Sequence, residues 1–244
     1  MIRENFTLRY SSLFSFTPKK SYANHEFNIP NQNELDRAYS LMQILKNDQE
    51  VIVGEKKENF NFIEYTARYI KKRLNEKEFA AKFSFFGDDA ILVPIPKSTL
   101  MKGDTLWVPK RIALELEKQG LGKYIDLLER IYSVNRSSTS QPSDRPLPEE
   151  HYKSTRIKDT FIEVGKNTTF VLVDDVITRG STLLGCANRI LDVWSNVEIY
   201  GFAIFRTISN YTDFKYFLDP KTGKIKYRTE TKDTIRDDLE ILRF

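Results

Sequence analysis

Apolar residues recur at helical spacing along the first third of the chain. The segments 33–47 and 60–75 both place apolar side chains three or four positions apart, which predicts two amphipathic helices. The apolar positions of the first are Leu35, Ala38, Leu41, Met42 and Leu45, and those of the second are Phe62, Tyr65, Ala67, Ile70 and Leu74. Residues 1–30 are aromatic-rich but irregular, and we expect no element there.

From residue 90 onward, short apolar runs alternate with helical segments. The run Ala90-Ile-Leu-Val-Pro-Ile-Pro96 is typical of a buried parallel strand. We expect further strands at 126–134, 159–164, 170–175 and 197–206, helices at 106–119 and 181–194, and a long polar loop at 136–156. Strands that alternate with helices predict an α/β fold with an open parallel sheet, whose ligands bind at the carboxyl ends of the strands.

The last part of the chain predicts a β-hairpin. Its two strands would be 214–219 and 224–229, joined by a turn at Pro220-Lys-Thr-Gly223. An exposed flap explains this hairpin as well as any functional role does. The expected organisation is a helical elaboration at 1–87, an α/β core at 88–210 and a hairpin tail at 211–244.

Composition narrows the class of protein. The 244 residues are 40% hydrophobic and carry a net charge of 38 − 34 = +4, spread along the chain, which suits an anionic small molecule but does not indicate nucleic acid. The single Cys186 excludes an internal disulfide and a cysteine-based metal cluster. No apolar run is long enough for a membrane span, and Met1-Ile-Arg-Glu4 does not open a signal peptide, so we expect a cytoplasmic protein.

The segment 170–185 carries the most informative chemistry. It reads Phe-Val-Leu-Val-Asp-Asp-Val-Ile-Thr-Arg-Gly-Ser-Thr-Leu-Leu-Gly, an apolar strand that ends in Asp174 and Asp175 and is followed by a short polar turn and a helix. Two carboxylates can accept hydrogen bonds from sugar hydroxyls or hold a divalent cation. The turn can present backbone N–H groups to a phosphate at the helix N-terminus, where the helix dipole also favours an anion.

This segment resembles the phosphoribosyl-pyrophosphate (PRPP) loop of the type I phosphoribosyltransferases. The resemblance implies that Asp174 and Asp175 face the ribose 2- and 3-hydroxyls. The residues that would wrap the 5-phosphate are Thr178, Arg179, Gly180, Ser181 and Thr182. Arg179 departs from the usual Thr or Ser and could add a phosphate contact or point outward. A response-regulator receiver domain and a solvated acidic turn are the competing interpretations.

Two further segments extend the resemblance, which spans roughly residues 88–208. Pro96-Lys-Ser-Thr99 is similar to the pyrophosphate loop of ComF-like phosphoribosyltransferases, with Lys97, Ser98 and Thr99 facing the anion; a strand-ending turn with a solvated lysine is the alternative. The loop at 136–156 is similar to one that closes over PRPP, and Arg136 and Arg145 are the candidate pyrophosphate contacts. His151 is a candidate general acid or base, although a lone loop histidine is more often solvated.

The resemblance implies a phosphoribosyltransferase, a glycosyltransferase of nucleotide metabolism. It would bind PRPP with Mg²⁺, held mainly through PRPP and by Asp174 or Asp175, and transfer phosphoribosyl to a nitrogen acceptor with release of pyrophosphate. The acceptor cannot be identified from the sequence. The alternatives are a non-catalytic module that senses PRPP or a nucleotide within a larger protein or nucleic-acid complex, and an effector enzyme acting on nucleotides or NAD-like substrates. A homodimer or a larger complex is also compatible with the sequence.

Overall fold

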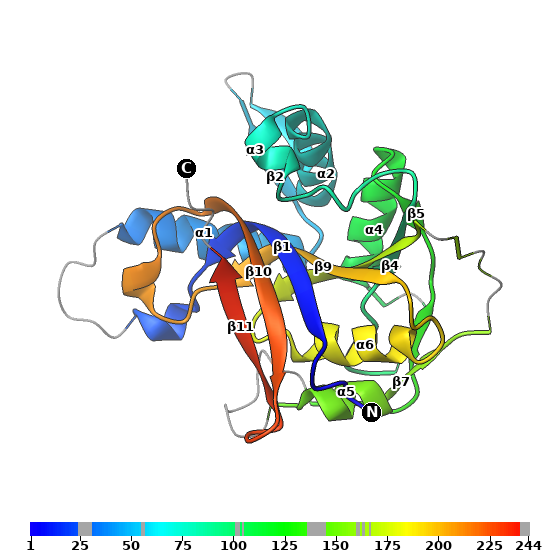
Figure 1. The fold of residues 1–244 in the computed structure, drawn as a ribbon. Coiled ribbons are helices and arrows are strands. Elements are labelled where there is room, and N and C mark those ends of the chain that lie inside the picture. The colour runs from blue at the N-terminus through cyan, green and yellow to red at the C-terminus, as the bar shows by residue number, and fades with distance from the viewer. Residues whose placement is uncertain are drawn as a thin grey trace.

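The computed structural model describes residues 1–23, 31–54, 57–100, 103, 105–135, 145–159, 162, 164–165 and 167–239 (Figure 1). The elements of the first half are β1 (Thr7–Phe16), η1 (Lys19–Ser21), α1 (Gln32–Lys46), β2 (Glu50–Val53), β3 (Glu58–Asn61), α2 (Phe62–Arg73), α3 (Lys77–Ala80), β4 (Ala90–Pro94), α4 (Val108–Lys118) and β5 (Lys123–Tyr124). Those of the second half are β6 (Leu128–Arg130), α5 (Pro148–Lys153), β7 (Thr155–Ile157), β8 (Thr169–Ile177), α6 (Ser181–Leu191), β9 (Glu198–Thr207), η3 (Tyr211–Asp213), β10 (Leu218–Arg228) and β11 (Asp233–Leu239).

A seven-stranded sheet in the order β11-β10-β1-β9-β8-β4-β5 forms the centre of the molecule. Five strands run parallel to one another: β1, β9, β8, β4 and β5. β10 is antiparallel to both of its neighbours, β1 and β11. The α/β class with a mostly parallel sheet is therefore confirmed. Figure 1 shows β11, β10 and β1 side by side in front of the remaining strands.

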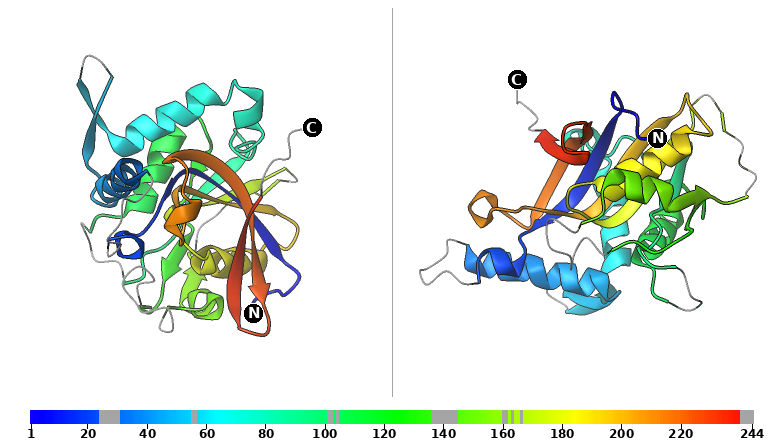
Figure 2. Two further views of the ribbon diagram at one scale, coloured as in Figure 1. Left: turned by 90° about the vertical axis from the view of Figure 1, so that its left-hand side faces the viewer. Right: turned by 90° about the horizontal axis from the view of Figure 1, so that it is seen from below.

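Helices cover both faces of the sheet, so that a hydrophobic core lies on each face. The side chains of β8 alternate between these two cores. Val171 and Val173 pack into the cluster that contains α1, α2 and α4, and Phe170 and Leu172 pack into the cluster that contains α6. Figure 2 shows α4 and α6 on opposite sides of the sheet. A strand buried on both faces explains the continuous apolar run that precedes Asp174.

The N-terminal segment differs from the expectation. Residues 7–16 form β1, which is buried almost throughout and lies between β9 and β10, so the prediction of an irregular segment at 1–30 is wrong for these residues. Three serines interrupt the apolar pattern here. Ser11 Oγ donates to Lys82 O at 2.5 Å and Ser15 Oγ donates to Tyr216 O at 2.8 Å, so two of the three buried hydroxyls have partners distant in sequence, whereas Ser12 Oγ has none among the described residues.

The hairpin exists, but its expected register is wrong. The segment Pro220–Gly223 is no turn: β10 runs through it, and the chain reverses at 229–232 before β11. Pro220 is tolerated because β11 pairs with β10 only from Thr222 onward. Gly223 is required by packing, since a Cβ there would lie 2.5 Å from the ring of Tyr10. Because β10 pairs with β1 along most of its length, the hairpin extends the central sheet and is not a separate flap.

The expected loop at 136–156 is shorter than predicted. Within its described part, residues 148–153 form α5 and β7 begins at Thr155, so the loop prediction is wrong there. The strand expected at 126–134 shortens to β6, which pairs with β7 at Thr155–Ile157. Residues 160, 161 and 163 of the strand expected near 159–164 lie outside the described part of the chain. Residues 136–144 lie outside the described part of the chain. The division at 87/88 and 210/211 stays a prediction.

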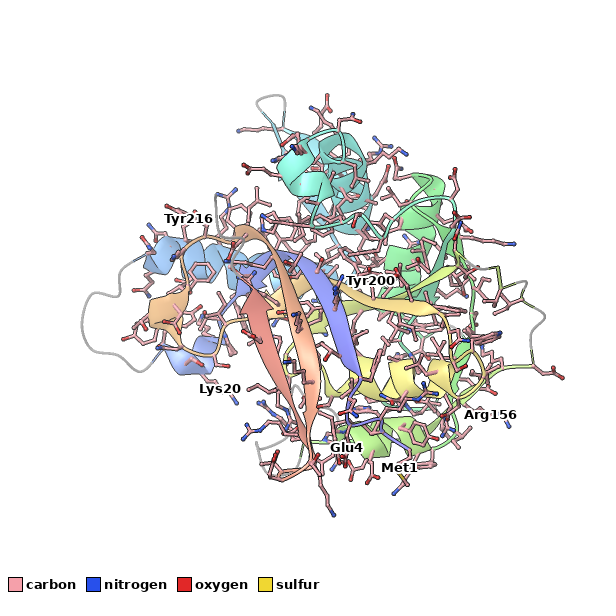
Figure 3. All side chains as sticks on the ribbon, in the orientation of Figure 1. Met1, Glu4, Lys20, Arg156, Tyr200 and Tyr216 are labelled. Carbon is pink, nitrogen blue, oxygen red and sulfur yellow. The ribbon has the colours of Figure 1, made fainter. Side chains whose placement is uncertain are left out.

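Exposed basic side chains lie on different parts of the surface. Lys20 and Arg156, both exposed, lie on opposite sides of the view in Figure 3, as expected for a net charge spread along the chain. No helix in the described ranges is long and apolar enough to cross a membrane.

Candidate functional site

The candidate site lies where the strand order of the sheet reverses. The chain leaves β4 through α4 to reach β5 on one side, and it leaves β8 through α6 to reach β9 on the other. The adjacent carboxyl ends of β4 and β8 therefore diverge, and open α/β sheets bind ligands at such a point. Beyond Val173 β8 continues without pairing to β4, which leaves Asp174 at the free corner.

A small pocket occupies this corner. Its volume is about 60 Å³, and it is lined by Arg145, Asp174 and residues 176–183. All five residues predicted to hold a phosphate belong to this lining. One buried water needs roughly 10–15 Å³ of such space. The pocket is therefore large enough for a small anionic group such as a phosphate.

Backbone geometry prepares the pocket for an anion. Gly180 adopts φ +86° as the N-cap of α6, a conformation that favours glycine, and Ser181 and Thr182 begin the helix. The first N–H groups of a helix have no partner within it, and the helix dipole adds partial positive charge at this end. The structure thus joins the predicted loop to a helix N-terminus.

The two adjacent aspartates diverge. Asp174 lines the pocket, and its Oδ1 accepts the backbone N–H of Asp175 at 2.8 Å. Asp175 is buried, and its Oδ2 accepts from Lys46 Nζ on α1 at 2.6 Å. Neighbouring residues of a strand point to opposite faces. Asp174 is consequently the aspartate that reaches the pocket.

Asp174 is held in surroundings that disfavour its charge. Burial, and then the nearby charge of Asp175, raise the pKa of Asp174 above its usual value, while Lys46 opposes the increase. A carboxyl group of this kind can exchange a proton near neutral pH. It would also regain its charge beside a cation.

Arg145 extends the pocket from the segment before α5. It lines the pocket together with the loop, and its Nε is buried without a hydrogen-bond partner in the described ranges. The guanidinium of Arg145 therefore lies at an anion-sized space, although its Nε is itself shielded from that space. The other predicted loop arginine, Arg136, lies outside the described residues.

The Pro-Lys segment does not contribute to the pocket. Lys97 Nζ donates to Leu106 O at 2.9 Å, and the backbone carbonyls of Pro96 and Lys97 accept from Arg130 at 3.5 and 3.0 Å. Ser98 O accepts the N–H of Val134 at 2.8 Å. Neither these three residues nor Thr99 are among the residues that line the pocket. Their predicted role as a pyrophosphate loop stays a prediction.

Arg179 is engaged by the C-terminal hairpin. Its Nη1 forms an ion pair with Asp233 at the start of β11, and its Nη2 donates to Pro146 O at 3.4 Å. Ser181 Oγ donates to Asp233 Oδ1 at 3.3 Å and lies 3.0 Å from Thr234 Oγ1. The hairpin thus reaches two side chains of the predicted phosphate loop, residues 178–182.

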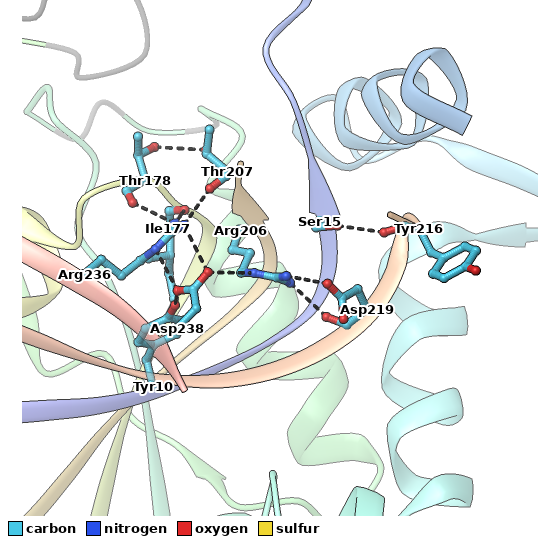
Figure 4. A network of polar contacts seen from close by, with 10 residues as sticks. All are labelled: Tyr10, Ser15, Ile177, Thr178, Arg206, Thr207, Tyr216, Asp219, Arg236 and Asp238. Carbon is cyan, nitrogen blue, oxygen red and sulfur yellow. Dashed lines mark hydrogen bonds and ion pairs between the residues drawn. The ribbon is translucent and has the colours of Figure 1, made fainter. Parts of the chain in front are cut away.

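Arg236 fixes the hairpin at the ends of two parallel strands (Figure 4). Its guanidinium donates to the carbonyls of Ile177, Thr178 and Thr207 at 3.0, 2.8 and 2.7 Å. Asp238 accepts from Arg236 Nε at 3.1 Å and from Arg206 Nε at 3.2 Å. These contacts tie the base of the predicted phosphate loop to β11.

His151 is buried and is not the solvated loop residue that the sequence favoured. It lies on α5, and its Nε2 is 3.2 Å from Thr182 Oγ1, while its Nδ1 has no described partner. Burial, and then the charges of Arg130 and Arg179, lower the pKa of His151 to about 3. The imidazole is therefore neutral at physiological pH and supports Thr182 from within the protein.

Three residues of the site were not identified from the sequence: Lys46, Asp233 and Arg236. They are far from the motif in the chain, and their local patterns resemble ordinary solvated positions. His151 was named as a candidate general acid or base, but without the helix that buries it. No group of three or more His, Cys, Asp or Glu side chains that could hold a metal ion is found in the described ranges.

Comparison with known proteins gives no assignment: no family model and no curated protein matches this chain.

Proposed function

We propose that this chain is a type I phosphoribosyltransferase-like protein of the ComF-like kind. Its ligand would be PRPP or another nucleotide that contains ribose 5-phosphate, bound with Mg²⁺. The observation that carries the proposal is the pocket formed by Asp174, Arg145 and the contiguous residues 176–183 at the switch point of the sheet. A carboxyl group on one side and a helix N-terminus on the other match the two ends of a ribose 5-phosphate.

Different residues of the pocket would bind different groups of the ligand. The N–H groups at the start of α6, with Thr178 and Thr182, would hold the 5-phosphate. Asp174 would accept a hydrogen bond from a ribose hydroxyl, and Arg145 would approach the pyrophosphate. These contacts orient the sugar, which is the main contribution of a protein to a reaction of this type.

Asp174 also fits a divalent cation. Carboxylate oxygens are the donors that Mg²⁺ prefers, and Mg²⁺ in nucleotide sites is held by one or two carboxylates together with phosphate oxygens. Asp174 offers such an oxygen toward the pocket, and Asp175 adjoins it. The bound ion would neutralise charge on the pyrophosphate.

The proposed transfer is a substitution at the anomeric carbon of the ribose. The bond from this carbon to the pyrophosphate oxygen breaks, and its electron pair leaves with pyrophosphate. The lone pair of an acceptor nitrogen forms the new bond, and the acceptor gives up its N–H proton to solvent or to a base. Positioning by the loop and charge stabilisation by Arg145 would lower the barrier.

A binding module is the second candidate, and a specific observation favours it. Asp233 engages Arg179 and Ser181 within the phosphate loop, and Lys97 donates to a backbone carbonyl of its own loop. A protein that senses PRPP or a nucleotide needs the pocket but not the complete set of pyrophosphate contacts. Such a module would bind the same ligand without turnover.

Calorimetry with PRPP, with and without Mg²⁺, tests the binding. We expect the wild type to bind in a Mg²⁺-dependent manner and Asp174→Asn/Asp175→Asn to lose this binding. Asp213→Asn/Asp237→Asn is the matched control, because both aspartates are exposed and the pair carries the same charge change. Absence of PRPP and nucleotide binding to a folded wild type would refute the proposal. Pyrophosphate release in the presence of a panel of bases separates the transferase from the binding module.

A further inference from the structure

We propose that Asp233 is an internal competitor for the phosphate and sets the affinity of the pocket. This inference rests on the proposed phosphate site and adds a residue that the PRPP motif does not contain. Asp233 belongs to β11, more than fifty residues after the loop that it contacts. Its carboxylate bonds to the loop side chains that a phosphate would otherwise engage.

The contacts of Asp233 resemble those of a bound oxyanion. One carboxylate oxygen pairs with Arg179 Nη1, and the other accepts from Ser181 Oγ at 3.3 Å and from the N–H of Thr234 at 2.7 Å. Arg179 and Ser181 both line the pocket. A carboxylate and a phosphate compete for the same guanidinium and hydroxyl donors.

The hairpin holds Asp233 in this position. Three residues after Asp233, Arg236 donates to the carbonyls of Ile177 and Thr178 at 3.0 and 2.8 Å, so β11 is fixed to the base of the loop. Ile225 of β10 covers the loop so closely that a Cβ on Gly180 would lie 2.4 Å from its Cδ1. The position of the Asp233 carboxylate is thus fixed by the packing of β10 and β11 against the loop.

The Asp233 side chain can nevertheless leave its contact with Arg179. About 23% of its side chain and 25% of the Arg179 side chain are exposed, so rotation of the carboxylate toward solvent needs no movement of the hairpin. Phosphate carries more negative charge than a carboxylate, and both anions beside one guanidinium would repel each other. Phosphate binding must therefore displace Asp233 from Arg179.

The test is titration calorimetry with ribose 5-phosphate in the absence of divalent cations. Asp233→Asn keeps the size of the side chain and removes its charge. We expect this variant to bind about tenfold more tightly than the wild type, since the competing charge-assisted contact is lost. Asp237→Asn should bind like the wild type, because it makes the same charge change on an exposed position of the same strand.

A second variant identifies the released donor. Adding Arg179→Ala to Asp233→Asn should cancel the gain in affinity, and thermal melting without ligand verifies that each variant is folded. If Asp233→Asn binds with the affinity of the wild type or more weakly, Asp233 is not a competitor, while the phosphate site itself stands. If the gain persists without Arg179, the proposed displacement is wrong. If none of the folded variants binds ribose 5-phosphate, the phosphate site and the competitor are both refuted.

Discussion

At the scale of single residues, Asp174 shows how a site can cost stability. Its native pKa is raised by burial and by Asp175, whereas an aspartate in the unfolded chain titrates near pH 3.9. Above that pH the native protein retains a proton that the unfolded chain has lost. The free energy of unfolding contributed by this group therefore falls as the pH rises through the window between the two pKa values.

Asp174→Asn should remove this cost. We expect the variant to unfold with a free energy higher than that of the wild type by on the order of 2 kcal/mol at pH 8, and with a smaller gain at pH 5. Denaturant unfolding at both pH values, without divalent cations, measures the difference. Asp237→Asn is the exposed control and should change neither value appreciably. Equal gains at both pH values would argue against a titrating Asp174.

His151 predicts the opposite dependence on pH. Its pKa is about 3 in the folded protein, against about 6.5 in an unfolded chain, so below pH 6.5 the unfolded chain binds a proton that the native protein excludes. The stability contributed by the neutral imidazole is lost as the pH falls. In His151→Gln we expect the loss of unfolding free energy between pH 7 and pH 5 to shrink by about 2 kcal/mol. Denaturant unfolding at the two pH values measures this, and an unchanged loss would contradict the burial of a neutral histidine.

The residues that could be predicted are those that stand together in the chain. Asp174 and the loop 178–182 were identifiable because one strand, one turn and one helix bring them together locally. Lys46 and Asp233 could not be identified, because each reaches the site only through the pairing of distant strands and helices. A lysine at the end of a helix and an aspartate after a turn are ordinary surface patterns.

At the scale of elements, helices were predicted more accurately than strands. The apolar spacing located α1, α2, α4 and α6 to within a few residues. β1 was missed because serines interrupt its apolar pattern, and Ser11 and Ser15 find their partners only in segments distant from β1 in the sequence. β10 was wrongly divided into a strand and a turn because proline and glycine usually mark turns. Here Pro220 lies where β11 does not pair with β10, and Gly223 packs against the ring of Tyr10.

Arg236 gives the element scale a direct test. Its side chain satisfies carbonyls at the ends of β8 and β9 that would otherwise lack these donors. Arg236→Ala should lower the free energy of unfolding by about 2–3 kcal/mol, since hydrogen bonds to a charged group are lost at a partly buried position. It should also speed hydrogen exchange in β11 before that in β9. Arg228→Ala, which removes an exposed arginine from β10, is the control and should do neither.

At the scale of the whole molecule, both ends of the chain build the same sheet. β1 lies between β9 and β10, so strands from the beginning and the end of the described chain are neighbours at one side of the sheet, next to β9 from its middle. The α/β class followed from the alternation of strands and helices, but the strand order did not. Order depends on which distant strands pair, and local periodicity contains no information about that pairing.

The hairpin should therefore be indispensable for folding. A chain that ends at Phe217 loses β10 and β11, which leaves β1 without its antiparallel partner. It also removes Asp219 and Asp238 from Arg206, whose side chain is only 3% exposed, and an unpaired buried charge costs roughly 3–5 kcal/mol. That is a large fraction of the about 5–15 kcal/mol that stabilises a typical protein. We expect the shortened chain to show no cooperative thermal transition by circular dichroism and to elute as aggregates.

Insertion of two glycines between the exposed Glu230 and Thr231 is the control, because it lengthens the turn and leaves every strand pair in place. A shortened chain that melts cooperatively, like the control, would show that the hairpin is a dispensable flap after all.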